Sequence, residues 1–106
     1  MRKIGQYYDA GMKLLPGVVA PSDYIDARVL AATVAEVITV PAGATFVMFS
    51  GTADFYVRFN AAATIPSGDV TDGTASELNP QSRVIYGPTI GIISPVICIV
   101  TLAFYS

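Results

Sequence analysis

The sequence lacks several residue types on which protein chemistry depends. Its 106 residues include no histidine, no tryptophan and a single cysteine, Cys98. Without histidine the chain has neither the commonest general base nor the commonest metal ligand. One cysteine excludes an intrachain disulfide and a zinc site built from thiolates. Cys98 lies in an apolar run with no basic neighbour in sequence to activate it, so we expect a buried structural thiol.

Charge is also scarce. Only 13% of the residues are charged, the net charge is −2, and six Lys and Arg are spread along the chain. Binding to nucleic acid needs a clustered basic surface, so we expect no nucleic-acid partner. Hydrophobic residues make up 53% of the chain. Such an excess of apolar surface on a small chain must be buried in lipid or against other protein.

The acidic loop residues do not form a recognisable site. Asp69, Asp72 and Glu77 lie around Gly73, but their spacing does not fit a helix-loop-helix calcium motif, and Asp-Gly is a common turn dipeptide. Serine and threonine lack an activating partner, because there is no histidine and no lysine beyond Lys13. We therefore expect no catalytic residues, no metal, no cofactor and no enzymatic activity.

Residues 90–105 are uncharged and raise the question of a membrane anchor. The segment has 16 residues and contains Pro95, whereas a membrane-spanning helix needs about 20 apolar residues. Its Ile, Val, Thr, Phe and Tyr are residues favoured in strands. We expect two buried strands separated at Ser94-Pro95 and no membrane partner; a small membrane-anchored protein is the competing interpretation.

The central segment predicts two strands of different kinds. In residues 54–60, Phe55, Val57 and Phe59 fall on one face and polar side chains on the other, which is typical of a half-buried strand. Residues 45–49 have large apolar side chains on both faces, so we expect both faces to be covered. A chain of this size has little material for that purpose, which indicates that partner subunits cover part of it.

The rest of the chain has the rhythm of an all-β protein. A turn is expected at residues 41–44 and a long loop at residues 61–82, which is rich in Gly, Pro, Ser, Thr and Asp. Further strands are expected at residues 29–34, 36–40, 83–86, 89–93 and 96–105. Six to eight short strands predict an antiparallel β-sandwich or short jelly roll over residues 28–106.

Residues 1–27 differ from the rest and predict an N-terminal arm. Ile4, Tyr8, Met12 and Leu15 have near-helical spacing, but two glycines weaken a helix there and Pro16-Gly17 ends it. We expect a short helix or none, lying against another surface. Tyr56 and Arg58, with Asp54, share the polar face of their strand and form either a binding surface or an ordinary solvent face. The candidate partner-binding residues are Ile4, Tyr7, Tyr8, Met12, Leu15, Tyr56 and Arg58.

Three stretches of the sequence resemble a known family: VITVPAGATFVMFSGTADFYVRF, DVTDGTASELNP and VICIVTLAFYS. Together they are similar to the small β-sandwich virion proteins of tailed bacteriophages, of the capsid decoration or cement type, over roughly residues 28–105. The resemblance implies a structural protein, made in the host cytoplasm, that binds the major capsid protein on the capsid surface. It also implies a homodimer or homotrimer that bridges neighbouring capsid subunits, with residues 1–27 as an arm.

A small domain with neither disulfide nor metal points independently to a homo-oligomer, because its own core is modest. The alternative function is a receptor- or glycan-binding module of a phage tail or head fibre, which would use Tyr56, Arg58 and the loop at residues 61–82. The absence of tryptophan, a common sugar-stacking residue, counts against that alternative.

Overall fold

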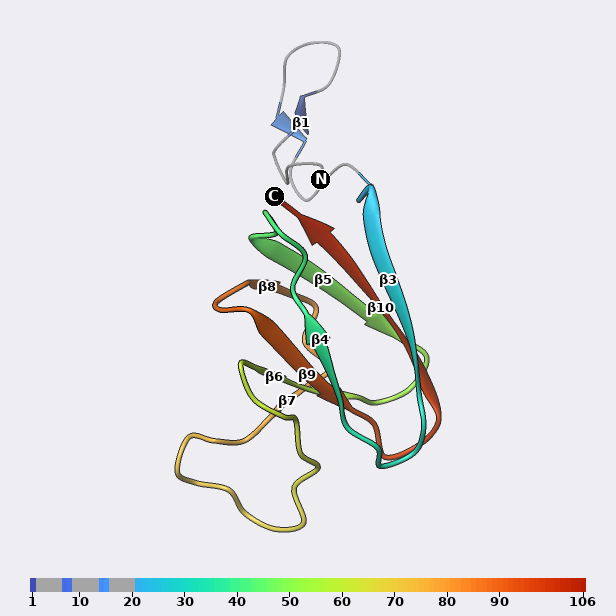
Figure 1. Ribbon diagram of the computed structural model, residues 1–106, viewed down its shortest axis with the longest axis vertical. Helices are drawn as coiled ribbons and strands as arrows, with labels where there is room; N and C mark the ends of the chain where they lie inside the picture. The colour runs from blue at the N-terminus through green and yellow to red at the C-terminus, as the bar shows by residue number, and fades with distance from the viewer. Residues whose placement is uncertain (2–6, 9–13, 16–20) are drawn as a thin grey trace.

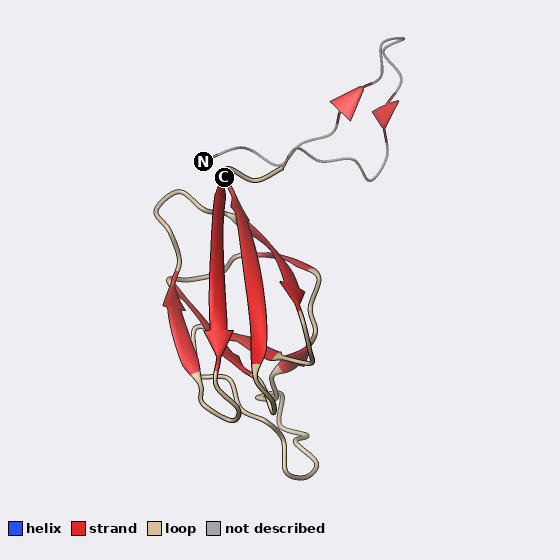
Figure 2. Cartoon of the chain, turned by 90° about the vertical axis from the view of Figure 1, so that its right-hand side faces the viewer, coloured by secondary structure: helices blue, strands red, loops and turns tan. Residues whose placement is uncertain are grey.

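The structure is a computed structural model that describes Met1, residues 7–8, residues 14–15 and residues 21–106. Within residues 21–106, two four-stranded sheets pack face to face (Figure 1), and no helix is present in this part (Figure 2). The β10 sheet contains, in spatial order, β3 (Tyr24–Leu30), β10 (Cys98–Tyr105), β5 (Phe46–Gly51) and β8 (Ser82–Val84). The β9 sheet contains β4 (Glu36–Thr39), β9 (Thr89–Ile93), β6 (Tyr56–Phe59) and β7 (Glu77–Leu78). The predicted β-sandwich is confirmed.

The order of the strands is that of a jelly roll. Along the chain, every connection from β3 to β10 crosses between the two sheets except the one from β6 to β7, which are neighbours in one sheet. Every strand pairing in this part of the chain is antiparallel. Eight strands wound in this way are the double Greek key of the jelly roll. One inner strand of each sheet, β9 and β10, comes from the C-terminal quarter of the sequence.

The core lies between the inner faces of the two sheets. Strand β10 contributes every second residue to it, and these side chains are almost completely buried, while Ile99 between them is exposed. Strand β9 contributes Ile90 and Ile92 from the opposite side. The core side chains of β10 are Cys98, Val100, Leu102 and Phe104. Cys98 is buried, as expected from its apolar surroundings, and its thiol donates a hydrogen bond to the carbonyl oxygen of Ala53 at 3.5 Å.

The alternation predicted for residues 54–60 is confirmed. Phe55 and Val57 are buried, and Phe59 is partly buried against the same core. For residues 45–49 the expectation of two covered faces is not met by the chain itself. Val47 and Phe49 point into the core, whereas the opposite face, with Phe46 and Met48, is only half-buried. The reason is that the sandwich has two layers, so each sheet has one inner face.

The uncharged C-terminal segment forms two strands, as predicted. Strand β9 ends at Ile93 and β10 begins at Cys98. Ser94 between them is fully buried, and its hydroxyl donates a hydrogen bond to the carbonyl oxygen of Asp54 at 2.7 Å. Among the residues that the structure describes, no helix is long and apolar enough to cross a membrane.

The sandwich begins earlier than the predicted boundary at residue 28. Strand β3 starts at Tyr24, and residues 24–27 pair with the last half of β10. The hydroxyl of Ser22 donates a hydrogen bond to the carbonyl oxygen of Phe104 at 2.6 Å, and the rings of Tyr24 and Phe104 meet edge to face at 5.9 Å. The sequence pattern missed this start because the strand contains Asp26 and Arg28, which resemble surface residues.

Two short strands lie within the predicted arm. Strand β1 (Tyr7–Tyr8) pairs antiparallel with β2 (Leu14–Leu15). The helical option therefore does not apply at Tyr8 and Leu15. Ile4 and Met12, the other two residues of that pattern, lie outside the described residues.

The central aromatic core residue gives a direct test of the inner face. Phe55→Ala removes a buried ring that lies 6.2 Å from the ring of Phe49. We expect the free energy of unfolding to fall by about 3–5 kcal/mol, measured by chemical denaturation. Tyr86→Ala is the control, because that side chain is 75% exposed and its loss should cost within about 0.5 kcal/mol. Equal effects of the two substitutions would contradict this inner face.

Two truncations test where the folded domain begins. Removing residues 1–20 leaves β3 intact, so we expect an unfolding midpoint close to that of the full chain. Removing residues 1–27 deletes the Ser22 hydrogen bond and four paired residues of β3. It should destabilise the protein by at least about 2 kcal/mol, since each lost hydrogen bond costs about 1 kcal/mol. Two equally stable truncations would show that the pairing of residues 24–27 contributes nothing.

Candidate interaction surfaces

The outer face of the β10 sheet is uncharged, largely apolar and partly exposed. The strand register aligns its side chains in rows: Ile25, Ala103 and Met48 form one row, and Val29 and Ile99 form another. Val29 is 68% exposed and Ile25 is 58% exposed. The register also places Tyr105 beside Phe46 on this side, but its side chain is buried at 3% exposure. We call the rest of this surface the outer β10 face; it consists of Ile25, Ala27, Val29, Phe46, Met48, Ser50, Ser82, Val84, Ile99, Thr101 and Ala103. None of these side chains, which all belong to the described strands, is charged. An exposed apolar sheet face of this kind is typical of an interaction surface.

The outer face of the β9 sheet is different, because the chain itself crosses it. Residues 61–63 lie over Gly91, where an added Cβ atom would meet the carbonyl oxygen of Ala61 and come within 2.7 Å of the Ala63 amide nitrogen. Ala63 is buried. Ile93, which the register places on this outer face beside Tyr56, is buried as well. Residues 61–63 therefore cover part of this face, whereas Ile25 and Val29 on the outer β10 face are exposed.

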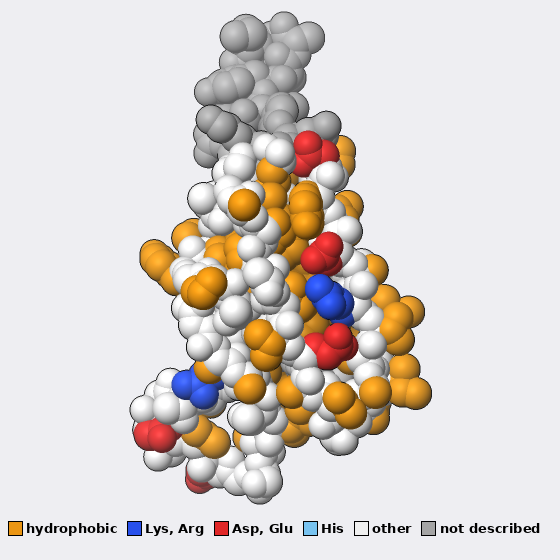
Figure 3. Space-filling view, viewed as in Figure 1, with side chains coloured by type: hydrophobic (Ala, Val, Ile, Leu, Met, Phe, Trp, Pro, Cys, Tyr) orange, Lys and Arg blue, Asp and Glu red, His pale blue; other side chains and the backbone are white. Residues whose placement is uncertain are grey.

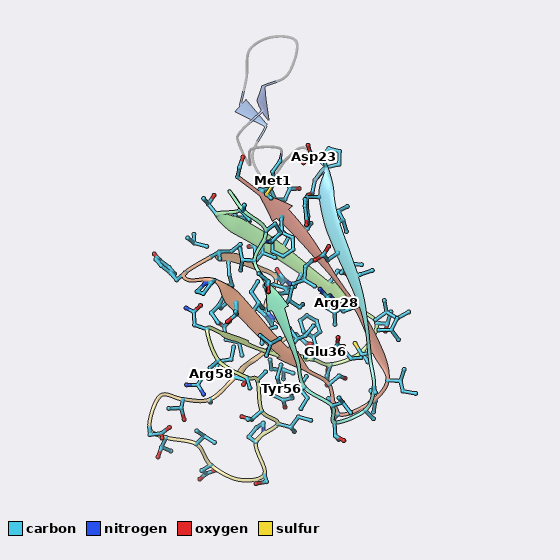
Figure 4. The ribbon with its side chains drawn as sticks, viewed as in Figure 1. Met1, Asp23, Arg28, Glu36, Tyr56 and Arg58 are labelled. Atoms are coloured by element: carbon cyan, nitrogen blue, oxygen red, sulfur yellow. The ribbon has the colours of Figure 1, made fainter. Side chains whose placement is uncertain are left out.

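Charged side chains close the open side of the sandwich between the edge strands β3 and β4. Asp26, Arg28 and Glu36 lie opposite buried residues of β10 and β9 in the register, so they point inward. The Asp26 and Arg28 side chains approach to 3.9 Å. Figure 3 shows acidic and basic side chains following one another down this side, and Figure 4 labels Arg28 and Glu36. Inward-pointing charges on edge strands prevent pairing with the edge of another sheet.

The opposite open side is closed in the same way by β7 and β8. The Arg83 guanidinium donates two hydrogen bonds to one Glu77 carboxylate oxygen, at 2.6 and 2.9 Å. The hydrogen bonds and charge of Glu77 raise the pKa of Arg83 above its ordinary value. Both groups are exposed to solvent, so the pair adds little to stability. Because Arg83 and Glu77 lie on two short edge strands, their charges oppose pairing with the edge of another sheet.

The structure brings together two of the predicted partner-binding residues. Tyr56 and Arg58 lie on β6, half-buried on the outer face of the β9 sheet, near the loop at residues 61–82 (Figure 4). Asp54 does not join them in a polar cluster, because its carboxylate accepts a hydrogen bond from the Asn79 side chain at 2.9 Å. Of the arm candidates, Tyr7, Tyr8 and Leu15 lie in β1 and β2.

The acidic residue Asp72 stabilises a turn within the long loop. The Asp72 carboxylate accepts hydrogen bonds from the Thr74 hydroxyl at 2.6 Å and the Thr74 amide at 3.1 Å, around Gly73 with a φ of 87°. These hydrogen bonds lower the pKa of Asp72, with a smaller contribution from the positive charge of Arg58. Among the described residues, no group of acidic, histidine or cysteine side chains is placed to hold a metal ion. Figure 1 shows the loop projecting at the end of the sandwich opposite the C-terminus.

An open hollow of about 360 Å³ lies at the turn between β5 and β6. Asn79 fixes the shape of this hollow through two hydrogen bonds to Phe55. The Asn79 side-chain oxygen accepts a hydrogen bond from the backbone amide of Phe55 at 3.0 Å, and the backbone amide of Asn79 donates one to the carbonyl oxygen of Phe55 at 2.9 Å. Within the described part of the chain, no buried side-chain polar atom lacks a hydrogen-bond partner. The hollow therefore presents no unpaired buried group toward a ligand.

No protein-family model matches this chain, and no curated protein or solved structure matches it. Sequence reasoning singled out Tyr56 and Arg58 but missed the outer β10 face as a unit. One signal was available in the two-sided apolar pattern of residues 45–49. The contribution of Ile25 and Val29 required the pairing of β3 with β10.

The crossing over Gly91 gives a test of the covered face. Gly91→Ala places a methyl group against the backbone of residues 61–63, and overpacking of this kind costs about 1–3 kcal/mol. We expect a lower unfolding midpoint and faster proteolysis within residues 61–76. Gly68→Ala is the matched control in the same loop, because an added Cβ atom there meets nothing within 4 Å. A stable Gly91→Ala variant would show that the segment does not lie against β9.

Proposed function

We propose that this chain is a structural, non-catalytic virion protein that decorates and stabilises a bacteriophage capsid by bridging neighbouring capsid subunits as a homo-oligomer. The observation that carries the proposal is the outer β10 face, an exposed and uncharged sheet face on a small jelly roll. Jelly rolls occur in viral capsid proteins and also in lectins and cupins. The fold by itself does not decide among these functions, and an uncharged apolar surface favours burial against protein.

The proposed role also accounts for the scarcity of charge. A shell under internal pressure is reinforced by many copies of the same contact, so a modest energy per copy becomes large in total. A protein that stays buried between subunits needs little charge on those surfaces, because obligate interfaces resemble a divided core. In this proposal the partner is the major capsid protein, the site is the capsid surface, and the chain folds in the host cytoplasm.

The second candidate is a receptor- or glycan-binding module of a tail or head fibre. Its support is the pairing of Tyr56 and Arg58 beside the loop at residues 61–82, together with the use of jelly rolls by lectins. Both side chains are only half-exposed, and the chain has no tryptophan for stacking on a sugar ring. A glycan array on the purified protein separates the two candidates, since only the binding module retains sugars and loses them in Tyr56→Ala.

Binding to capsid shells tests the first candidate. The full chain should co-sediment with assembled, expanded shells of the phage that encodes it, with saturation at a fixed ratio to capsid subunits. Shells carrying the protein should withstand a higher temperature, because each bound copy adds contact area. Removing residues 1–20 should weaken attachment by about tenfold or more, as loss of one of several linked contacts does. Absence of saturable binding would contradict the proposal; shells of an unrelated phage serve as the control.

A further inference from the structure

We propose that the outer β10 face is the contact between two copies of this chain, packed face to face about a twofold axis. The inference deepens the proposed function and rests on it for the expectation of a homo-oligomer. It names which surface joins the copies and leaves the β9 sheet, with its covering segment at residues 61–63, free to face other partners.

The charge of the face favours a second copy as its occupant. In a twofold contact the same surface faces itself, so a charge near the axis would meet its own counterpart, and a charge elsewhere would need an opposite charge on the same face. The chain carries a net charge of −2. Its described charged side chains lie at the open sides, in the loop at residues 61–82, at Arg58, at Asp23 before β3 and at Asp54 before β6. The outer β10 face has none. It is the surface on which two copies approach without electrostatic repulsion.

The shape of the outer β10 face also fits the same face of a second copy. Ala27, Thr101 and Ser50 form a row of small side chains across the three strands β3, β10 and β5. On one side of this row lies the row that contains Ile25 and Met48, and on the other lie Val29 and Ile99. A shallow trough therefore runs between two ridges of larger side chains, the first of which is interrupted by Ala103 on β10. Under a twofold axis the ridge of one copy fits the trough of the other, as facing sheets interdigitate in a sandwich.

The size of the face predicts a contact of moderate strength. Only every second residue of a strand points outward, so each outward side chain has two residues of strand length, about 6.6 Å, to itself. With a strand spacing near 4.8 Å, it occupies about 30 Å² of the sheet in projection. The eleven residues of the outer β10 face thus project to roughly 350 Å², with a larger accessible area because side chains stand up from the sheet. A standard interface buries about 800 Å² per partner. We therefore expect a dimer that dissociates on dilution.

The other ways of joining two sandwiches are blocked in the described part of the chain. Edge-to-edge pairing is opposed by the inward charges of β3 and β4 and by the shortness of β7 and β8, which have two and three residues. Face-to-face packing through the β9 sheet is opposed by the segment that crosses Gly91. The outer β10 face is the sheet surface that these obstacles leave.

Sedimentation equilibrium on the full chain tests the inference. The wild-type mass should approach twice 11.1 kDa as concentration rises to about 100 µM, a range that reveals micromolar association. Val29→Lys should halve that mass, because it places an unpaired ammonium group in an apolar contact from which water is excluded. Val37→Lys is the matched control: Val37 is also an outward valine on an edge strand, 55% exposed, but it lies on the β9 sheet. It should leave the dimer intact.

Thermal unfolding followed by circular dichroism checks that each variant is folded. If Val29→Lys does not fold, Ile25→Lys takes its place, because Ile25 is a second exposed position on the same face. A wild-type monomer throughout the range, a trimer, or a dimer indifferent to both β3 substitutions would overturn the inference. Shell binding separates its failure from that of the proposed function. If the protein forms a dimer that Val29→Lys disrupts but does not bind capsid shells, the proposed function is wrong and the dimer contact stands. If the protein is a monomer and Val29→Lys abolishes its binding to shells, the outer β10 face binds the capsid protein and the dimer contact is wrong.

Discussion

The structure depends on one apolar layer between the two sheets. The inner side chains of β10 and β9 meet there, and facing sheets hold such a layer at about 10 Å thickness. Successive residues of a strand point to opposite faces, so burying one set commits the alternate set to the outside. Because Val100 and Leu102 are buried, Ile99 must lie outside. A shift of one residue in the register of a strand would turn all of its side chains to the other face, so the outer β10 face follows from the register of the core.

Charge is distributed in the reverse of the usual arrangement. Charged residues commonly occupy the solvent face of a sheet, yet here Asp26, Arg28 and Glu36 point inward at one open side. Arg83 and Glu77 do the same at the other. These side chains reach water past the edges of the sandwich, so they avoid the cost of burial. The arrangement protects the edges of the sheets, which are the usual sites of unwanted pairing.

The two outer faces differ because of one glycine. Gly91 has no side chain, and residues 61–63 occupy the space over it. Ala63 in this crossing and Ile93 on the same face are both buried, and the start of the long loop lies against the sheet. No such segment from residues 21–106 covers Ile25 and Val29, which stay exposed. The asymmetry supports a division of roles in which one face joins copies and the other, with Tyr56, Arg58 and the loop, faces a different partner.

The sequence by itself determined the elements whose pattern is local. The alternation at Phe55, Val57 and Phe59 identified a strand and its buried face, and Ser94-Pro95 marked the break between two strands, because period and turn chemistry are properties of neighbouring residues. Only the tertiary structure decided that β3 begins at Tyr24, since its inward positions carry charges that are acceptable solely at an open edge. It also decided which side chains share the outer β10 face, because those rows join residues of strands far apart in the chain, and pairing between such strands leaves no signal in either segment alone.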